Sequence, residues 1–237
     1  MACFHHSIKS GKKGSAVAHS VYISRGARED LIYTSHGNLP EWAADSPKLF
    51  WRMANAHERA NGAVYREHEI ALPNELTREQ LIEIAERLVR ELVGTKPFQF
   101  AIHGPDGKLG GIPNPHIHLM YSDRVPDGIE RSPKQMFSRF NSQRPETGGC
   151  RKDSGGKSPL ELRSAVVFAR KKVADIQNQT LAGLGHDARV DHRSLREQGI
   201  QRHAERHLGP AFIRGMSRAD KAKFAEHRLS GSAAEEA

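Results

Sequence analysis

Two short segments in the middle of the chain alternate between apolar and polar residues. Residues 97–103 read PFQFAIH and residues 116–122 read HIHLMYS, and a loop rich in glycine and proline separates them. Alternation with a period of two is typical of β-strands, because successive side chains point to opposite faces of a sheet. Two such strands joined by a turn-forming loop form a hairpin. We therefore expect an antiparallel sheet at the centre of the fold.

Two further segments favour strands. Residues 2–9 alternate in the same way and end at a GKKG turn. Residues 63–72 read AVYREHEIAL and form the other candidate. On this second strand Glu67 and Glu69 share one face, so that two carboxylates point the same way.

Four segments carry apolar residues at helical spacing. They cover residues 15–26, 47–59, 77–93 and 159–182. The clearest one starts at Thr77, where Gln80 completes a capping box, and stops at Gly94. Ser15 is a plausible N-cap for the first helix. Residues 30–46 show no clear pattern, and Pro40 interrupts them.

These elements predict an α+β fold, with a central antiparallel sheet flanked by helices and a mainly helical C-terminal part. We expect a core over residues 1–150, a basic helical part over residues 151–229, and a disordered tail over residues 230–237. The whole chain has 36 Lys and Arg against 28 Asp and Glu. Residues 151–229 alone hold 17 and 9. This part is a candidate surface for a polyanion, although a solvated helical surface would have the same composition.

The cysteines and the apolar runs narrow the class of protein. Cys3 and Cys150 are the only cysteines, so a disulfide scaffold or a thiolate zinc site is not expected. No apolar run is long enough for a membrane span or follows a positive N-terminus as in a signal peptide. The sequence favours a soluble cytoplasmic protein without membrane insertion.

Three histidines are candidate metal ligands. His116 and His118 are two residues apart on a strand, so both rings leave the same face with Cβ atoms roughly 6–7 Å apart. His103 ends the preceding strand, and hairpin pairing brings it alongside them. Three imidazoles with open positions left over are typical of a catalytic metal site. The alternative is that they are ordinary surface histidines, since the chain has 14.

A metal ion beside a polyanion can bind phosphate oxygens, but phosphoryl chemistry also needs a nucleophile. The tyrosines of the chain are Tyr22, Tyr33, Tyr65 and Tyr121. Tyr121 alternates away from the histidine face and Tyr65 sits within a strand. Tyr22 lies in the last turns of a short helix with small neighbours that would let DNA approach. A packing role is the alternative for a tyrosine considered by itself.

These residues, in this order, resemble the MobA/MobL (MobQ) relaxases of the HUH endonuclease superfamily. SAVAHSVYISRG looks like the tyrosine motif of that family, and ERANG with YREHEIALP looks like its acidic motif. AIHG, NPHIHLMYSDR and DGIER look like its histidine motif, and GHDARVDHRS with HLGP looks like its C-terminal segment. The resemblance covers roughly residues 1–210. A tyrosine that precedes the histidines is the relaxase order, whereas rolling-circle initiators and related transposases place it afterwards.

The resemblance implies a role for each candidate residue. Tyr22 would be the nucleophile, and His103, His116 and His118 would bind Mn²⁺ or Mg²⁺. Of Glu67 and Glu69, one would orient a histidine and the other would help to remove the tyrosine proton. A solvated strand face is the alternative for these two carboxylates.

The implied reaction is a transesterification at the nic site of a plasmid origin of transfer. Tyr22 would stay joined to the 5′ phosphate and release a 3′ hydroxyl that later reverses the step, without a nucleotide cofactor. The DNA partner would be the single strand at nic with its adjacent duplex or hairpin, and a coupling protein and accessory mobilisation proteins are further candidates. Arg25, Arg170, Lys171 and Lys172 are candidate DNA contacts, with a solvated helix face as the alternative for the last three.

Two other classes of protein remain open at this stage. A three-histidine metallohydrolase that acts on a small phosphate or ester would share the metal site but would not need Tyr22. A basic, non-enzymatic DNA-binding accessory protein would need neither the metal nor the tyrosine. Relatives of the resembled family often continue into a primase or helicase extension, and the sequence leaves open whether this chain is a whole protein or one domain.

Overall fold

The computed structural model describes residues 4–25, 30–105, 113–201 and 210–233. The chain divides into two compact units. The first unit is Met1–Gly104 with Pro115–His192, and the second is Pro105–Asn114 with Arg193–Ala237. All candidate site residues belong to the first unit.

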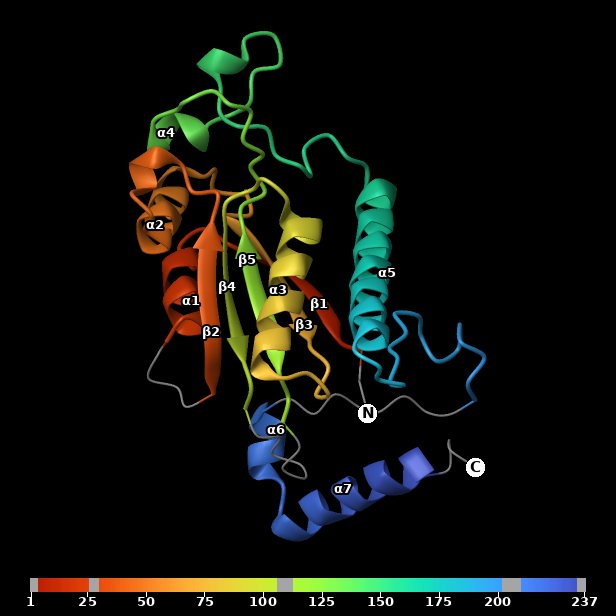
Figure 1. Cartoon of the computed structure of the whole chain (residues 1–237). Helices are drawn as coiled ribbons and strands as arrows, with labels where there is room; N and C mark the ends of the chain where they lie inside the picture. The colour runs from red at the N-terminus through yellow and green to blue at the C-terminus, as the bar shows by residue number, and fades with distance from the viewer. Residues whose placement is uncertain (1–3, 26–29, 106–112, 202–209, 234–237) are drawn as a thin grey trace. The chain divides into compact units, whose positions relative to one another are not determined.

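In the described part of the first unit, five strands form one antiparallel sheet (Figure 1). They are β1 (His6–Gly11), β2 (Leu31–Gly37), β3 (Tyr65–Ala71), β4 (Phe98–His103) and β5 (His116–Tyr121). Their order in space is β1-β3-β5-β4-β2, and each neighbouring pair is antiparallel. The predicted hairpin of β4 and β5 is present at the centre of the sheet. The predicted α+β class is confirmed.

Strand β2 is the element that the sequence analysis missed. It forms one edge of the sheet through its pairing with β4. Six of its seven residues are partly buried and one is exposed, so no alternation marks the segment. Strand β1, on the other edge, begins at His6, later than the strand predicted over residues 2–9.

Helices α1 (Ala16–Ile23) and α2 (Pro47–His57) cover one face of the sheet. Their buried residues pack with side chains from β3, β4 and β5 and from the segment after β5. The largest buried members of this cluster are Ile23, Phe50, Trp51, Met120 and Phe137. Ser46 caps α2 by accepting from the Leu49 amide at 3.2 Å. Ser15 precedes α1, but its hydroxyl donates to the Lys12 carbonyl instead of capping the helix.

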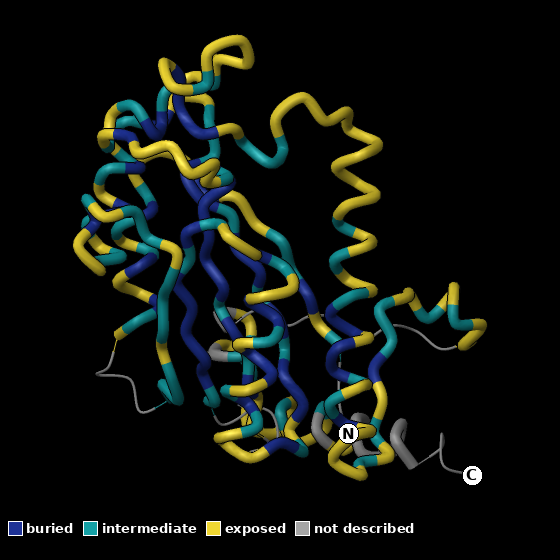
Figure 2. Tube along the Cα trace, turned by 45° about the horizontal axis from the view of Figure 1, so that its top comes forward, coloured by how far each residue is buried: buried dark blue, intermediate teal, exposed yellow. Residues whose placement is uncertain are grey.

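Helices α3 (Arg78–Val93) and α5 (Pro159–Gly183) cover the opposite face. The capping box of Thr77 and Gln80 is present at the start of α3, and its predicted apolar stripe packs into the core. Only the second half of α5 is buried, although the sequence predicts one apolar stripe along its whole length. The first half is exposed (Figure 2), including Leu160 and Phe168.

The segment between β5 and α5, residues 122–157, is called the connecting lobe below. It contains the short helix α4 (Pro133–Met136) and a 3-10 turn, Pro145–Thr147, while a second 3-10 turn, Glu41–Ala43, precedes α2. The lobe begins directly after β5, so it lies at the end of the sheet away from His116.

The second unit contains α6 (Pro210–Gly215) and α7 (Arg218–Ala233). Helix α7 therefore extends into the tail that was expected to be disordered, and the last four residues lie outside the described residues. The division into a core over 1–150 and a basic part over 151–229 stays a prediction. Among the helices that the structure describes, none combines the length and apolar character that crossing a membrane requires.

Candidate active site

Three histidines lie together at one end of the two central strands. His103 pairs across the hairpin with His116, and His118 follows two residues farther along β5. The ring centroids are 5.8 Å apart for His103 and His116, and 5.6 Å apart for His103 and His118. Those of His116 and His118 are 5.1 Å apart. The structure thus brings together the three histidines that the sequence singles out.

The hydrogen bonding of His103 leaves one ring nitrogen for a ligand. Its Nε2 lies 2.8 Å from the carbonyl oxygen of Ile23 and must donate, because a carbonyl oxygen only accepts. Nδ1 is then the nitrogen with the lone pair, and it is buried without a hydrogen-bond partner. Asp30 Oδ1 is 3.7 Å from it, beyond hydrogen-bond distance. A metal ion is a partner that suits such an orphaned imidazole nitrogen.

The spacing of the three rings can be compared with that of a metal centre. An imidazole nitrogen binds a metal at about 2.1 Å, which places ring centroids around one ion roughly 5 Å apart. The observed separations of 5.1 to 5.8 Å are slightly wider. Within the described ranges, no group of three His, Cys, Asp or Glu is already arranged to hold an ion. The three imidazoles are donors of a type that binds divalent metals, and they lie close to one another. To bind one ion together, the rings must move slightly closer than the observed separations.

Glu67 fixes the orientation of the histidine at the centre of the group. It is 2% exposed and accepts from His118 Nδ1 at 2.8 Å and from His19 Nε2 at 2.9 Å. Burial by itself raises the pKa of Glu67, but the hydrogen bonds from His118 and His19 outweigh it and lower the pKa to about 2. Glu67 is therefore a carboxylate at neutral pH, and it leaves Nε2 as the lone-pair nitrogen of His118.

Tyr22 lies one residue before the end of α1 and is 47% exposed. The ring of His19, one turn earlier, stacks on Tyr22 with centroids 6.3 Å apart, and on Tyr65 at 5.1 Å. The same ring meets His118 edge to face at 6.5 Å. Together with the bond from His103 to the Ile23 carbonyl, these contacts bring the tyrosine to the histidine group.

His19 and Gln99 are site residues that the sequence analysis missed. The signal for His19 was its position three residues before Tyr22, which puts both on one side of a helix. Gln99 is buried, and its Oε1 accepts from the Ser20 hydroxyl at 2.7 Å and from Trp51 Nε1 at 3.1 Å. Its Nε2 donates to the hydroxyl of Ser24. These bonds attach α1 to the sheet on both sides of Tyr22.

Glu69 lies on the same face of β3 as Glu67 but in different surroundings. It forms an ion pair with Lys9 of the edge strand β1, and its side chain is 26% exposed. Burial raises the pKa of Glu69, and the hydrogen bond and charge of Lys9 lower it further than burial raises it. The two carboxylates of the predicted acidic face are thus distinguished by their partners, histidines for Glu67 and a lysine for Glu69.

The predicted DNA contacts fall in two places. Arg25 is exposed and follows α1 three residues after Tyr22. The other three are on α5, across the sheet from Tyr22. Arg170 donates to the His6 carbonyl at 3.2 Å. Lys171 pairs with an aspartate of its own helix, and Lys172 pairs with a glutamate of α3. The structure does not bring these three together with the histidine group.

Comparison with known proteins identifies a family for this chain. The model of the MobA/MobL family matches residues 13–218. The 43 kDa relaxation protein of Salmonella typhimurium is 43% identical over 209 residues, which cover 85% of this chain and 56% of that protein. Mobilization protein A of Escherichia coli is 38% identical over 239 residues, covering 95% of this chain and 32% of that protein. The chain spans between about a third and a little over half of the length of these relatives.

A solved structure shares the fold. The protein described under "Molecular Basis of Vancomycin Resistance Transfer in Staphylococcus aureus" superimposes with a TM-score of 0.60 at 21% identity. The match covers 81% of this chain and 100% of that chain. The arrangement of the sheet and its helices is therefore one that occurs in other proteins.

Proposed function

The chain belongs to the MobA/MobL family, and on that premise we propose that it is a DNA relaxase that cuts one strand at a plasmid origin of transfer through Tyr22. The observation that carries the proposal is the position of this tyrosine. It is half exposed on a helix that Gln99 attaches to the sheet, and the next residue, Ile23, accepts the hydrogen bond of His103. A nucleophile held in place beside three imidazoles suits attack on a phosphodiester.

The covalent step exchanges one phosphoester for another. The phenolic oxygen of Tyr22 attacks the scissile phosphorus, and the bond between phosphorus and the 3′ oxygen breaks. The DNA then stays joined to Tyr22 through its 5′ phosphate, and the 3′ oxygen leaves as a hydroxyl after it takes up a proton. The number of phosphoester bonds is unchanged, so the 3′ hydroxyl can reverse the reaction and reseal the strand.

His103, His116 and His118 are the proposed ligands for a divalent ion. When bound there, Mn²⁺ or Mg²⁺ would contact non-bridging phosphate oxygens and neutralise the charge that grows during attack. Glu67 would hold the ring of His118 in the tautomer that binds a metal, as its hydrogen bond to Nδ1 suggests. Glu69 stays the candidate for receiving the proton of Tyr22.

The test uses a supercoiled plasmid that carries the matching origin of transfer. The protein is incubated with it and Mn²⁺, the reaction is quenched with detergent, and the nicked 5′ ends are examined for attached protein. We expect an adduct that Tyr22→Phe abolishes. Tyr33→Phe is the matched control, because Tyr33 lies on β2 and packs against Phe100 in the core on the other face.

Other outcomes would point elsewhere. Nicking that survives in Tyr22→Phe would favour a metallohydrolase that uses water as the nucleophile. Binding of the origin that is unaffected by EDTA, without any adduct, would favour a DNA-binding accessory protein. The partners at the origin, accessory mobilisation proteins and a coupling protein, belong to the same proposal.

A further inference from the structure

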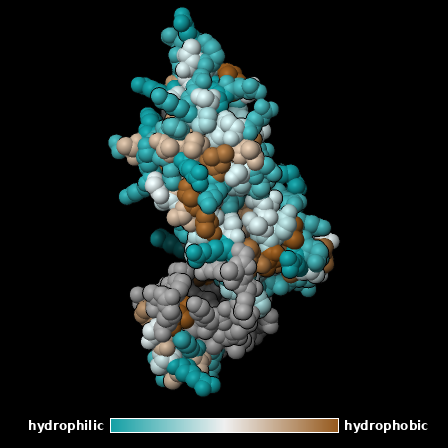
Figure 3. All heavy atoms as spheres, turned by 90° about the vertical axis from the view of Figure 1, so that its left-hand side faces the viewer, coloured by the Kyte–Doolittle hydropathy of each residue, from teal (hydrophilic) through white to brown (hydrophobic). Residues whose placement is uncertain are grey.

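The connecting lobe contains a cavity lined by basic side chains. It has a volume of about 410 Å³. Its basic lining residues are Arg59, Arg124, Arg139, Arg151 and Lys152. Two serines and Phe140 complete the side chains around it, and no acidic residue is among the lining residues. Figure 3 shows that this upper end of the first unit is mostly hydrophilic.

Two of the five cations, Arg124 and Lys152, form ion pairs with the carboxylate of Glu58. Glu58 is 2% exposed, accepts from Arg124 at 2.9 Å, and lies 3.2 Å from Lys152 Nζ. Burial raises the pKa of this carboxyl, and the hydrogen bond and charge of Arg124, with the charge of Lys152, lower it further than burial raises it. Arg124 also donates to the carbonyl oxygens of Phe137 at 2.6 Å and Cys150 at 2.6 Å. This pair of cations holds the lobe together.

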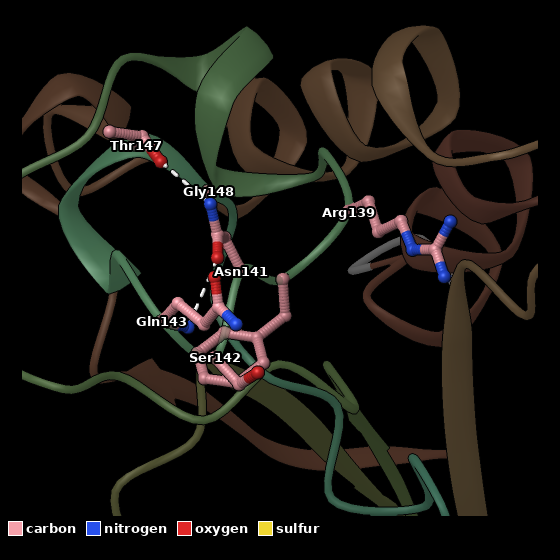
Figure 4. Close-up of a pocket in the computed structure, with 7 residues that line it drawn as sticks. Arg139, Asn141, Ser142, Gln143, Thr147 and Gly148 are labelled. Carbon is pink, nitrogen blue, oxygen red and sulfur yellow. Dashed lines mark hydrogen bonds between the residues drawn. The ribbon is translucent and has the colours of Figure 1, made fainter.

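The other three arginines are uncompensated. Arg59, Arg139 and Arg151 are exposed. In the part of the chain that the structure describes, their guanidinium groups form no hydrogen bond and no ion pair. Figure 4 shows Arg139 directed away from the loop of Asn141 and Thr147, which bond to each other at 3.1 Å. Three unpaired cations around one cavity repel one another, and an anion bound among them would offset this repulsion.

We propose that this cavity binds backbone phosphates of the DNA at a distance from the bond that is cut. The inference rests on the proposed function and adds a second contact surface to it. Guanidinium groups form paired hydrogen bonds with phosphate oxygens, and serine hydroxyls are common additional donors to them. Ser138 lies on the cavity wall as such a residue, whereas the hydroxyl of Ser154 already donates to Asp123.

The geometry of β5 sets the distance between the two surfaces. His116 is the first residue of β5, and Arg124 lies in the connecting lobe, three residues past the other end of the strand at Tyr121. A rise of about 3.3 Å per residue over its five steps places the two ends of the strand roughly 17 Å apart. This length corresponds to about five base pairs of duplex DNA, at about 3.4 Å each. The cavity therefore contacts DNA that flanks the nic site and not the scissile phosphate.

Salt dependence measures the phosphate contacts directly. Arg59, Arg139 and Arg151 are replaced by glutamine, singly and together, and the affinity for origin DNA is measured by fluorescence anisotropy between 50 and 200 mM salt. Each lost contact lowers the slope of log K against log salt concentration by about 0.7–0.9, so the triple variant loses roughly 2 to 3. Arg144→Gln is the matched control, since Arg144 is exposed in the same lobe but lines neither this cavity nor the pocket at Asn141 and Thr147 that Figure 4 draws.

A second DNA separates this inference from the proposed function. An oligonucleotide that carries only the few nucleotides around nic cannot reach the lobe, and the triple variant should bind it and attach to it as the unchanged protein does. Absence of any adduct on this short DNA from the unchanged protein would count against the relaxase proposal and leave the salt slopes interpretable. The melting temperature of the triple variant checks its folding.

Three results would overturn the inference. The first is a triple variant with an unchanged slope on the long DNA. The second is an equal loss of slope in Arg144→Gln, which would indicate general electrostatic attraction. The third is saturable binding of inorganic phosphate that needs these arginines while DNA affinity does not, which would make the cavity a site for a free anion.

Discussion

Two clusters of histidines lie on opposite faces of the same sheet, in different surroundings. On the α3–α5 face, His6 Nε2 and His68 Nδ1 are 2.8 Å apart, and Tyr121 stacks on His68. Burial, the neighbouring His68 and the charge of Arg170 lower the pKa of His6 to about 3. Burial and the charge of Lys96 lower the pKa of His68 to about 4. This pair is neutral in the folded protein and packs as part of the core.

On the α1–α2 face, two histidines donate hydrogen bonds to a buried carboxylate. Glu67 accepts from His118 and His19, and its pKa is lowered to about 2 against the effect of burial. A buried carboxylate stabilises positive charge next to it, whether the charge is a proton or a metal ion. His68 is adjacent to Glu67 in the sequence but faces the other way. The comparison shows that the face of the sheet, more than the residue type, decides which histidines have a carboxylate partner and which are packed as neutral core residues.

The largest expected difference between the two histidine clusters is the effect on nicking when a proposed metal ligand is lost. His118→Ala removes one imidazole, and we expect nicking to fall by at least about 100-fold, the upper range for loss of a supporting residue. His68→Gln, the matched change on the other face, should leave nicking within a few-fold. Rates of adduct formation on origin DNA give both numbers. Equal losses in the two variants would remove the distinction between the clusters.

Glu67→Gln should weaken the site by an intermediate amount. The amide can still accept from His118, but it lacks the charge, so we expect the affinity for Mn²⁺ to fall by about 10–100-fold. Calorimetric titration of the protein with Mn²⁺ measures this. Glu69→Gln serves as the comparison, because Glu69 pairs with Lys9 and not with a histidine. A larger loss of affinity in Glu69→Gln would reverse the roles.

The pH dependence of stability should sharpen the contrast. His6 and His68 bind fewer protons in the folded chain than in the unfolded chain, where their pKa is near 6.5. The contribution of these two histidines to the free energy of unfolding is complete above pH 6.5. It is lost as the pH falls toward 4 and 3, and the loss is on the order of a few kcal/mol. The contribution of Glu67 is complete above pH 4.5 and is lost as the pH falls toward 2.

Urea unfolding between pH 7.5 and 5 tests the first of these windows. The unchanged protein should lose free energy of unfolding across this range, and His68→Gln should lose less of it. A variant with the same pH slope as the unchanged protein would show that other groups dominate acid sensitivity.

The smallest expected effect is that of His19. His19→Phe keeps a ring between Tyr22 and Tyr65 but removes the hydrogen bond to Glu67, whereas His19→Ala removes both. Aromatic stacking contributes about 0.5–1.5 kcal/mol, so we expect His19→Ala to slow nicking by a further factor of roughly 2 to 10 relative to His19→Phe. Single-turnover rates with saturating DNA would resolve it. Identical rates in the two variants would exclude a contribution from stacking.

Much of the fold could be predicted because its elements carry strong local patterns. The β4–β5 hairpin alternates, and α3 has a capping box and a complete apolar stripe. Strand β2 lacks such a pattern because an edge strand with partly buried residues on both faces needs no alternation. The outer half of α5 carries apolar residues that nothing in the described structure buries, so its pattern alone was misleading.

The three histidines and Glu67 of the site could be predicted from the sequence, but His19, Gln99 and the arrangement of the side chains could not. Spacing put His103, His116 and His118 on one face, and the structure brings them together. The same spacing made Glu67 and Glu69 equivalent, because their difference comes from His19 on α1 and Lys9 on β1. Those partners are far away in the sequence, and no local pattern reports on contacts of that range.

The long-range contacts of α1 also have a consequence for the order of events during protein synthesis. Ile23 and His103 are 80 residues apart along the chain, and Ser20 and Gln99 are 79 apart. A ribosome adds about 5–20 residues per second, so Tyr22 is made about 5 to 20 s before His118. During that interval a nascent chain has the tyrosine without the three histidines, so the candidate site cannot form until β5 has been made.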